Sequence, residues 1–182
     1  MNEKISIIID GSNFYHRVKE LRFSGLSAFD YKKFGSFLAG KRNCVSYRYY
    51  VGAVREEAGN GKSRQLMANQ QKLVSHLKSQ GWEIGFGHIL KTDDYHEKGV
   101  DVLMATDLLV GAYENIFDSA ILVSSDTDLI PAIKKARSKG KKVEYVGFSH
   151  RPSYGLIKHC DIRRLLTKED VQQFFPQVNV KK

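Results

Sequence analysis

Strand-like and helix-like patterns alternate along this chain of 182 residues. Apolar runs of strand length occupy residues 4–9, 44–54, 82–90, 120–124 and 142–146. Helical patterns begin at about residues 13 and 31, and further ones cover residues 62–80, 100–113 and 128–139. Strands separated by helices usually pair in parallel through right-handed crossovers. The pattern therefore predicts an α/β fold with a central, mostly parallel sheet.

The end of the chain adds a shorter strand and helix. Residues 162–166 have the pattern of a strand, and residues 168–175 that of a helix that follows the near-capping box Thr167-x-x-Asp170. We expect residues 161–182 to form a C-terminal edge strand and helix. No Pro-rich or Ser-rich linker and no internal repeat divides the sequence, so residues 1–182 are predicted to form a single domain.

Acidic residues follow two of the predicted apolar strands. Residues 5–13 read Ile-Ser-Ile-Ile-Ile-Asp-Gly-Ser-Asn, and residues 121–128 read Ile-Leu-Val-Ser-Ser-Asp-Thr-Asp. Such apolar strands belong to parallel sheets that helices cover on both faces, and ligands of these sheets bind outside the carboxyl ends of the strands. The two runs therefore predict one acidic pocket at that edge of the sheet.

These aspartates also have structural explanations. Asp10 lies where Gly11 permits a tight turn and Asn13 opens a helix, so a helix cap or a turn is its alternative role. Asp126 and Asp128 are two residues apart across a strand-to-helix turn, where both can face the sheet edge and share a cation. For Asp128 the alternative is a cap on the helix that follows.

A further aspartate lies beside the apolar face of a predicted helix. Asp101 is in the first turn of helix 100–113, and Ala105 and Leu108 share its face at i+4 and i+7. A charge beside a buried face requires a partner. Asp107 lies roughly 120° away around the helix, at about 100° per residue. We therefore interpret Asp107 as a structural carboxylate outside the acidic pocket.

Carboxylates gathered in one pocket repel one another. At roughly 5 Å separation and an effective dielectric of about 20, each pair costs about 3 kcal/mol, so several pairs require a cation or protonation. Ligand sets of oxygen alone favour Mg²⁺ or Mn²⁺ over zinc. A hard divalent ion in a basic protein indicates phosphodiester chemistry, because the ion activates water and neutralises charge during in-line displacement.

The charge of the chain favours a polyanionic partner. With 29 Lys and Arg against 20 Asp and Glu, the formal net charge is +9, which indicates nucleic acid first and an acidic membrane second. The sequence has no stretch of membrane-spanning length and no secretory signal pattern, so we expect a cytoplasmic protein. Cys44 and Cys160 fit no disulfide or zinc pattern and are interpreted as free buried thiols.

Three motifs occur in order along the chain. They are Asp10-Gly-Ser-Asn13, Lys98-Gly-Val-Asp101, and Ser124-Ser-Asp126-Thr-Asp128 followed by Leu129 and Pro131. Together with the closing strand at 142–147, they resemble the NYN family of PIN-like metal-dependent nucleases, particularly its bacterial LabA-like branch. The resemblance covers most of the chain, up to about Leu166. Family members often carry Ser-Gly-Asp in place of Ser124-Ser125-Asp126, and Phe in place of Leu129.

The resemblance implies a PIN-like (Rossmannoid) three-layer sandwich that cleaves RNA, with an endoribonuclease as the favoured type. It implies a site for Mg²⁺ or Mn²⁺ on four aspartates: Asp10, Asp101, Asp126 and Asp128. Asn13 completes the predicted catalytic set by positioning water or the scissile phosphate, and the Ser125 hydroxyl assists. RNA is the implied partner ahead of single-stranded DNA, with no membrane partner, and homo-oligomer formation is left open. The alternative is a catalytically inactive RNA-binding or regulatory module of the same fold.

Two other classes of phosphate chemistry fit the sequence less well. The run Gly59-Asn-Gly-Lys-Ser63 has the setting of a P-loop, but Glu56 stands where the first glycine is required. A haloacid-dehalogenase-type phosphatase requires a second Asp two residues after the first, where this chain has Ser12. A phosphatase that acts on small phosphoesters is kept as a third alternative.

Several basic and aromatic residues are candidates for contact with RNA. The basic candidates are a loop with Arg55, Lys62 and Arg64 and a run with Lys134, Lys135, Arg137, Lys139, Lys141 and Lys142, each with a solvated surface as the alternative. Phe14 and Tyr15 are interpreted as packing residues, with stacking of either ring on a base as the alternative. Tyr47, Tyr49 and Tyr50 are expected in the core or on a sheet face, and His88, His96 and His159 as packed or surface residues.

Overall fold

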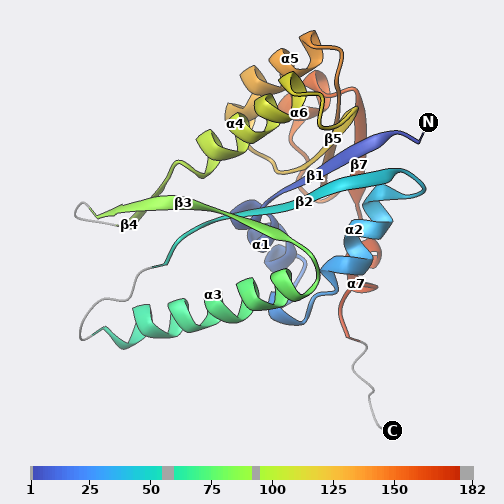
Figure 1. Ribbon diagram of the computed structural model, residues 1–182. Helices are drawn as coiled ribbons and strands as arrows, with labels where there is room; N and C mark the ends of the chain where they lie inside the picture. Colours follow the sequence, from blue (N-terminus) through green and yellow to red (C-terminus); the bar gives the residue numbers. More distant parts are fainter. Residues whose placement is uncertain (1, 55–59, 92–94, 177–182) are drawn as a thin grey trace, which may run out of the picture.

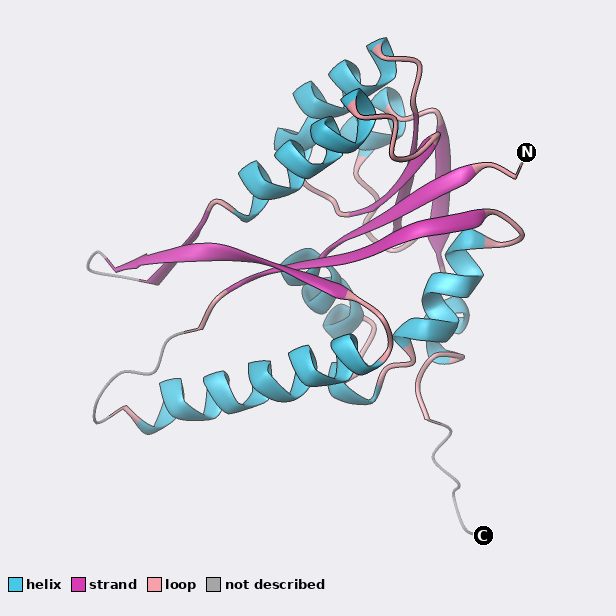
Figure 2. Ribbon diagram, in the orientation of Figure 1, coloured by secondary structure: helices cyan, strands magenta, loops and turns pink. Residues whose placement is uncertain are grey.

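The computed structural model describes residues 2–54, 60–91 and 95–176, which form one sheet between two layers of helices (Figure 1; Figure 2). The strands are β1 (Lys4–Asp10), β2 (Asn43–Gly52), β3 (Glu83–Lys91), β4 (Tyr95–Lys98), β5 (Ser119–Val123), β6 (Lys142–Phe148) and β7 (Ile162–Leu166). Their order is β4-β3-β2-β1-β5-β6-β7, and in the described part only β3 and β4 pair antiparallel. The predicted α/β sandwich with a mostly parallel sheet is confirmed.

Seven helices cover the two faces of the sheet in the described residues. One layer contains α1 (Gly11–Glu20), α2 (Tyr31–Ala39), α3 (Gly61–Ser79) and α7 (Lys168–Gln172), and the other contains α4 (Val100–Tyr113), α5 (Ile130–Ser138) and α6 (Tyr154–His159) (Figure 1). Strand alternation divides the core between these layers. Ile7 and Ile9 of β1 pack with Phe14 of α1, whereas Ile8 packs with Met104 and Leu108 of α4.

The central strand β1 marks the point where the order of the strands reverses. From β1 the chain builds β2 and β3 on one side, and it then returns to place β5 on the other side. In parallel sheets the crevice outside the carboxyl ends of two such strands is the usual ligand site. β1 ends at Asp10 and β5 ends at Val123, directly before Ser124 and Asp126. The fold therefore places two of the three acidic motifs at this crevice.

The structure differs from the sequence prediction at several element ends. The helix predicted from Asp128 begins with a 3₁₀ turn, η2 (Thr127–Leu129), before α5. The last helix ends at Gln172 rather than at residue 175, consistent with Pro176, which disfavours helical backbone at the residue before it. Its predicted capping box is confirmed, because Thr167 and Asp170 exchange hydrogen bonds. A second 3₁₀ turn, η1 (Leu26–Ala28), β4 and α6 were not predicted.

Other expectations concern the tyrosines, the cysteines and the membrane. Tyr49 and Tyr50 are fully buried in the core, as expected. Cys44 and Cys160 are free and half-buried, and burial raises the pKa of both thiols. Among the helices of the described residues, none is long and apolar enough to cross a bilayer.

Candidate active site at the carboxyl edge of the sheet

Asp10 ends the central strand and accepts three hydrogen bonds, although its side chain is buried and only 3% exposed. Its Oδ1 accepts from the backbone N of Asn13 at 2.9 Å. Its Oδ2 accepts from Asn13 Nδ2 and from Ser124 Oγ, each at 2.9 Å. The first bond caps α1, so the structural role considered for Asp10 is present. The same buried carboxylate also lies at the edge of the sheet where a ligand is expected.

Ser124 connects the ends of β1 and β5. Its hydroxyl donates to Asp10 and accepts from the backbone N of Asp126 at 3.0 Å. Asp126 Oδ1 in turn accepts from the backbone N of Asp128 at 2.8 Å and so caps η2. The capping residue of this turn is therefore Asp126. α5 follows Leu129 without a side-chain cap, so the alternative that Asp128 caps that helix is wrong. Asp128 lies within η2 and is exposed.

Asp101 approaches the same region from α4. The helix begins after Gly99, whose φ of 84° is in the left-handed region that favours glycine. A hollow of about 240 Å³ is lined by residues from three segments: Asp10, Ser12, Asn13, Val100, Asp101 and Asp126. We call it the acidic hollow. The structure thus brings Asp10, Asn13, Asp101 and Asp126 together, whereas Asp128 does not line the acidic hollow.

The acidic groups influence one another electrostatically. Burial raises the pKa of Asp101 above its ordinary value of 3.8, and the charges of Asp126, Asp10 and Asp128 raise it further. Asp128 therefore acts on Asp101 through its charge even though it does not line the acidic hollow. A raised carboxyl pKa is the expected consequence of like charges that are close together without a cation.

The raised pKa of Asp101 predicts a dependence of stability on pH. A carboxyl with a folded-state pKa above 3.8 favours the folded state below pH 3.8, and this contribution is lost as pH rises through the folded pKa. In metal-free protein, Asp101→Asn should therefore raise the melting temperature more at pH 7 than at pH 4. Melting curves of both proteins across this range provide the measurement. A difference that does not change with pH would contradict the charge coupling.

The oxygen atoms in the acidic hollow fit a hard divalent ion. Carboxylate, amide and hydroxyl oxygens suit Mg²⁺ or Mn²⁺, and no Cys or His among the described side chains lines the hollow. A carboxylate has about four lone-pair positions, and the three hydrogen bonds leave Asp10 able to accept another contact. As the side chains lie, no three acidic, His or Cys groups of the described residues are close enough to hold an ion. Binding would require these carboxylates to move toward one another.

Asp107 lies outside this group, as the helical geometry predicted. Its Oδ2 accepts a hydrogen bond from Tyr50 Oη at 2.6 Å and pairs with Arg48 Nη1 at 2.8 Å. Both partners belong to β2. Asp107 therefore holds α4 against the sheet, which supports the position of Asp101 earlier on the same helix.

Sequence reasoning missed three polar residues of the site, one of which is Ser12 in the lining of the acidic hollow. It gave no role to Ser124, although a serine directly after a buried strand and before Asp126 is a signal for such a contact. Arg17 was also missed. Its Nε donates to Ser125 Oγ at 3.4 Å and its Nη1 pairs with Glu20 at 3.0 Å. The Ser125 hydroxyl therefore accepts from a cation next to the acidic motif.

The two aromatic candidates for RNA contact differ clearly in their exposure to solvent. Phe14 is 1% exposed and packs among Phe29, Phe34 and Phe148, which confirms packing for this residue and excludes the alternative that its ring stacks on a base. Tyr15 is 47% exposed and stays a candidate.

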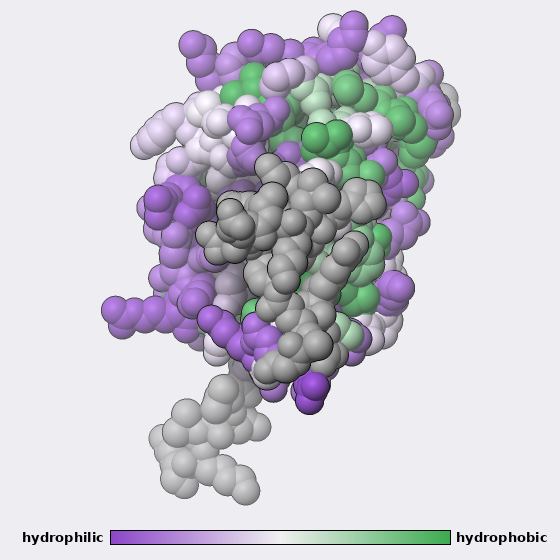
Figure 3. All heavy atoms as spheres, turned by 90° about the vertical axis from the view of Figure 1, so that its left-hand side faces the viewer, coloured by the Kyte–Doolittle hydropathy of each residue, from purple (hydrophilic) through white to green (hydrophobic). Residues whose placement is uncertain are grey.

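Figure 3 shows the face toward which the carboxyl ends of the strands point, with hydrophilic surface on its left and lower parts and hydrophobic surface toward its upper right.

The basic run that follows Asp128 leads away from the acidic hollow. α5 runs from η2 toward Lys142, the first residue of β6, so the basic run that follows Asp128 leads to the amino edge of the sheet. Arg137 in this run pairs with Asp161 at 2.6 Å. Lys62 and Arg64 lie in the first turn of α3. His159 is the half-buried last residue of α6. Four other residues or their side chains fall outside the described part of the chain: Arg55, Glu56, His88 and His96.

Comparison with known proteins identifies the family. Residues 4–166 match the family model of the NYN domain. This chain belongs to the NYN domain family. The match runs from the first residue of β1 to the last residue of β7, so the NYN domain includes all three acidic motifs. A search of curated proteins found no match.

The NYN domain is also similar to a solved structure. A crystal structure of a protein of unknown function from Vibrio parahaemolyticus is 27% identical in sequence and superposes with a TM-score of 0.66. The similarity covers 91% of this chain and 93% of the other. With the family match, this agreement confirms the predicted PIN-like three-layer sandwich.

Proposed function

We propose that this NYN domain is a metal-dependent ribonuclease that hydrolyses RNA phosphodiester bonds, as an endoribonuclease. One observation carries the proposal. Asp10, Asn13, Asp101 and Asp126, from three segments far apart in the sequence, line one hollow at the crevice between β1 and β5. The PIN-like nuclease fold of the family and the net charge of +9 support a negatively charged nucleic acid as substrate.

The acidic hollow supplies the ligands for a divalent ion. Asp10, Asp101, Asp126 and Asp128 would hold Mg²⁺ or Mn²⁺, with Asp128 joining from the edge of the hollow. When bound, the ion would make water a stronger nucleophile and neutralise charge on the phosphate that is attacked. Ser124 fixes Asp10 through its hydrogen bond, and α4 carries Asp101, so the chain provides one fixed carboxylate and one on a separate helix.

Asn13 is placed to orient water or the scissile phosphate. Its Nδ2 donates to Asp10, and its backbone N bonds to the same carboxylate. These two bonds fix the carboxamide, whose oxygen has no hydrogen-bond partner among the described residues. This oxygen can accept a hydrogen bond from water in the acidic hollow. Arg17 donates to Ser125, which precedes Asp126 in the sequence, so a cation and a hydroxyl lie next to the acidic motif.

Metal binding is predicted to stabilise the protein. At an ion concentration about ten times the dissociation constant, the gain is about 1.4 kcal/mol, or roughly a 3–6 °C rise in melting temperature. Melting curves with Mn²⁺ and with Mg²⁺ should show this rise for the unmodified protein and a smaller one for Asp101→Asn. Glu114→Gln, which removes one charge just past the other end of α4, serves as the matched control and should keep the full rise.

Cleavage itself is tested directly on RNA. Structured and unstructured RNAs are incubated with and without Mn²⁺, and products are separated by length. Cleavage that depends on the ion supports the proposal. Release of phosphate from a chromogenic phosphate ester, with intact RNA, would instead identify a phosphatase.

A catalytically inactive RNA-binding or regulatory module is the second candidate. It is favoured by the side-chain arrangement, in which no three ligand groups of the described residues are close enough to hold an ion as they lie. Under this alternative, RNA binds without turnover in the presence of either ion. The cleavage assay together with a binding assay distinguishes the two functions.

We also propose that residues 1–182 form a single domain of the LabA-like branch that acts in the cytoplasm, with RNA as its partner. Both β7 and α7, within the predicted C-terminal edge element, pack on the same sheet and core as the rest. Association into a homo-oligomer is tested by size-exclusion chromatography with light scattering.

A further inference from the structure

One face of α1 presents polar, aromatic and basic side chains in sequence. Ser12, Tyr15, Lys19 and Arg22 are spaced three, four and three residues apart, which places them along one side of the helix and its end. Lys19 Nζ lies 5.8 Å from the centroid of the Tyr15 ring. Tyr15, Lys19 and Arg22 are all exposed. We call these four residues the α1 stripe.

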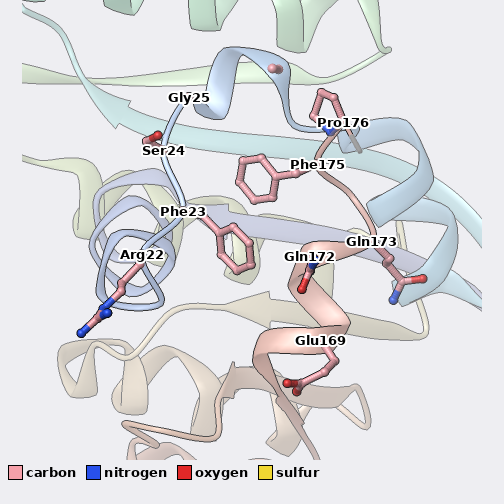
Figure 4. Close-up of a pocket in the computed structure, with 10 residues that line it drawn as sticks. Arg22, Phe23, Ser24, Gly25, Glu169, Gln172, Gln173, Phe175 and Pro176 are labelled. Carbon is pink, nitrogen blue, oxygen red and sulfur yellow. The ribbon is translucent and has the colours of Figure 1, made fainter. Parts of the chain in front are cut away.

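The α1 stripe connects two hollows. At one end, Ser12 lines the acidic hollow. At the other end, Arg22 lines a second hollow of about 800 Å³ between the end of α1 and α7 (Figure 4). α1 has 10 residues, which corresponds to about 15 Å at roughly 1.5 Å per residue. The second hollow is therefore about one helix length away from Asp10.

Two phenylalanine rings form the centre of this second hollow, which we call the aromatic hollow. Phe23 and Phe175 stack with their centroids 4.9 Å apart and 10° between the ring planes. Lys168 Nζ lies 5.8 Å from the centroid of the Phe23 ring. Figure 4 shows these rings between the α1 end, with Arg22 and Ser24, and α7, with Glu169, Gln172 and Gln173. Aromatic, basic, acidic and amide groups thus surround one space.

Arg22 occupies a backbone position that favours glycine. Its φ is 68°, in the left-handed region. Its backbone N donates to Lys19 O at 2.9 Å, and Phe23 N donates to Val18 O at 3.3 Å, the bonding pattern of a helix end at which glycine is usual. In the described part of the chain, the Arg22 side chain has no hydrogen bond or ion pair that compensates for this strain. The helix end therefore does not explain an arginine here.

These groups together match the chemistry of single-stranded nucleic acid. Aromatic rings stack on bases of any sequence, and lysine and arginine contact the phosphates between them. Carboxylate and amide groups pair with the donors and acceptors on base edges. The length of α1 corresponds to a few nucleotides of an extended single strand. Tyr15 and Lys19 lie between the two hollows, where intervening nucleotides would be.

We propose that single-stranded RNA follows the α1 stripe from the acidic hollow and places a base in the aromatic hollow. The proposal rests on the proposed function for the position of the scissile bond, which lies a few nucleotides from that base. The RNA is bound through its phosphates by Lys19, Arg22 and Lys168, and through its bases by Tyr15 and Phe23. Binding therefore depends on strand length and little on sequence.

To test this RNA path, RNA binding is measured separately from cleavage. Fluorescence anisotropy of a labelled, unstructured RNA of about twelve nucleotides is recorded with the whole chain in EDTA, which prevents metal-dependent cleavage. Lys19→Gln and Arg22→Gly should each weaken binding about three- to tenfold and lower the slope of log affinity against log salt by about 0.7. Arg22→Gly relieves the strained backbone, so its melting temperature should be equal to or above that of the unmodified protein.

Three further variants separate the local effect from general charge and from packing. Arg22→Lys keeps the charge and the strain and should bind RNA within about twofold of the unmodified protein. Lys41→Gln removes one charge just before β2, at the amino edge of the sheet, and should also change binding by less than about twofold. Phe23→Leu keeps an apolar side chain without the stacking surface and should weaken binding, with its melting curve as a control.

The outcomes distinguish this inference from the proposed function. Weakened binding in the α1 variants, with Lys41→Gln unchanged, supports the RNA path even if no RNA is cleaved. If RNA is cleaved but Lys19→Gln and Arg22→Gly bind like Lys41→Gln, the path is wrong and the nuclease assignment stands. Tight binding of free AMP or GMP that Phe23→Leu abolishes, with no dependence on RNA length, would overturn the path in favour of a mononucleotide site. Absence of RNA binding by the unmodified protein overturns it as well.

Discussion

Asp10→Asn is expected to abolish metal-dependent RNA cleavage while leaving the fold intact. The substitution removes the buried charge that would bind the ion, and charge stabilisation of this kind contributes several kcal/mol to the transition state. Because each 1.36 kcal/mol is a factor of ten in rate, we expect a fall of about a thousandfold or more. Asparagine caps helices as well as aspartate does, so the bond to the Asn13 backbone is retained. Cleavage rates with Mn²⁺ and melting curves provide the measurements.

Asp30→Asn is a matched control for this variant. Asp30 caps α2 as Asp10 caps α1, by accepting from the backbone N of Lys33 at 2.8 Å, but it is exposed and lies outside the acidic hollow. The same chemical change should therefore leave cleavage unaltered. Full activity in purified Asp10→Asn protein would reject the proposed site, whereas an equal loss in both variants would indicate a general effect of cap charge.

Gly11→Ala is expected to lower both stability and activity. A Cβ at this position would lie 2.3 Å from Cε1 of Tyr49 and 2.6 Å from the backbone O of Tyr50. Tyr49 is fully buried and the Tyr50 oxygen belongs to the neighbouring strand, so neither can move away easily. Overpacking of this kind costs about 1–3 kcal/mol, which corresponds to a fall of roughly 2–12 °C in melting temperature. The shift would also displace Asp10, and cleavage should fall with stability.

Gly61→Ala provides the comparison for a glycine without such contacts. Gly61 begins α3, and an added Cβ would have no atom of the described residues within 4 Å. Alanine there should leave stability unchanged or raise it by about 0.4–1 kcal/mol, because it restricts the unfolded chain. Equal melting temperatures for the two variants would show that the close approach at Gly11 is tolerated. Cleavage by the Gly61→Ala protein should match that of the unmodified protein.

Much of the fold could be predicted because strong local patterns determine it. The apolar runs that become β1 and β5 are buried on both faces, which leaves little ambiguity about their structure. The proximity of the acidic motifs that follow β1 and β5 could also be predicted, because the carboxyl ends of these strands meet at one edge of a parallel sheet. The separation of Asp107 from Asp101 followed from helical geometry alone.

Other features depend on contacts that no local pattern reveals. β4 has the polar sequence Tyr-His-Glu-Lys and is a strand because it pairs with β3. α6 is six residues long and lacks a clear helical period. Phe14 and Tyr15 are adjacent, and only the packing of α1 determines that the first is buried and the second exposed. The link from Ser124 to Asp10 spans 114 residues and requires the register of β1 and β5.

The position of Asp10 at the end of β1 also restricts how this domain can diverge. β1 has paired neighbours along both of its edges, and adding or deleting one residue would turn its isoleucines to the wrong layer. The length of this strand is therefore constrained while the domain keeps its core, whereas segments between the strands tolerate insertion. Relatives should accordingly vary in their connecting segments and keep the first carboxylate at a fixed distance from the start of the sheet.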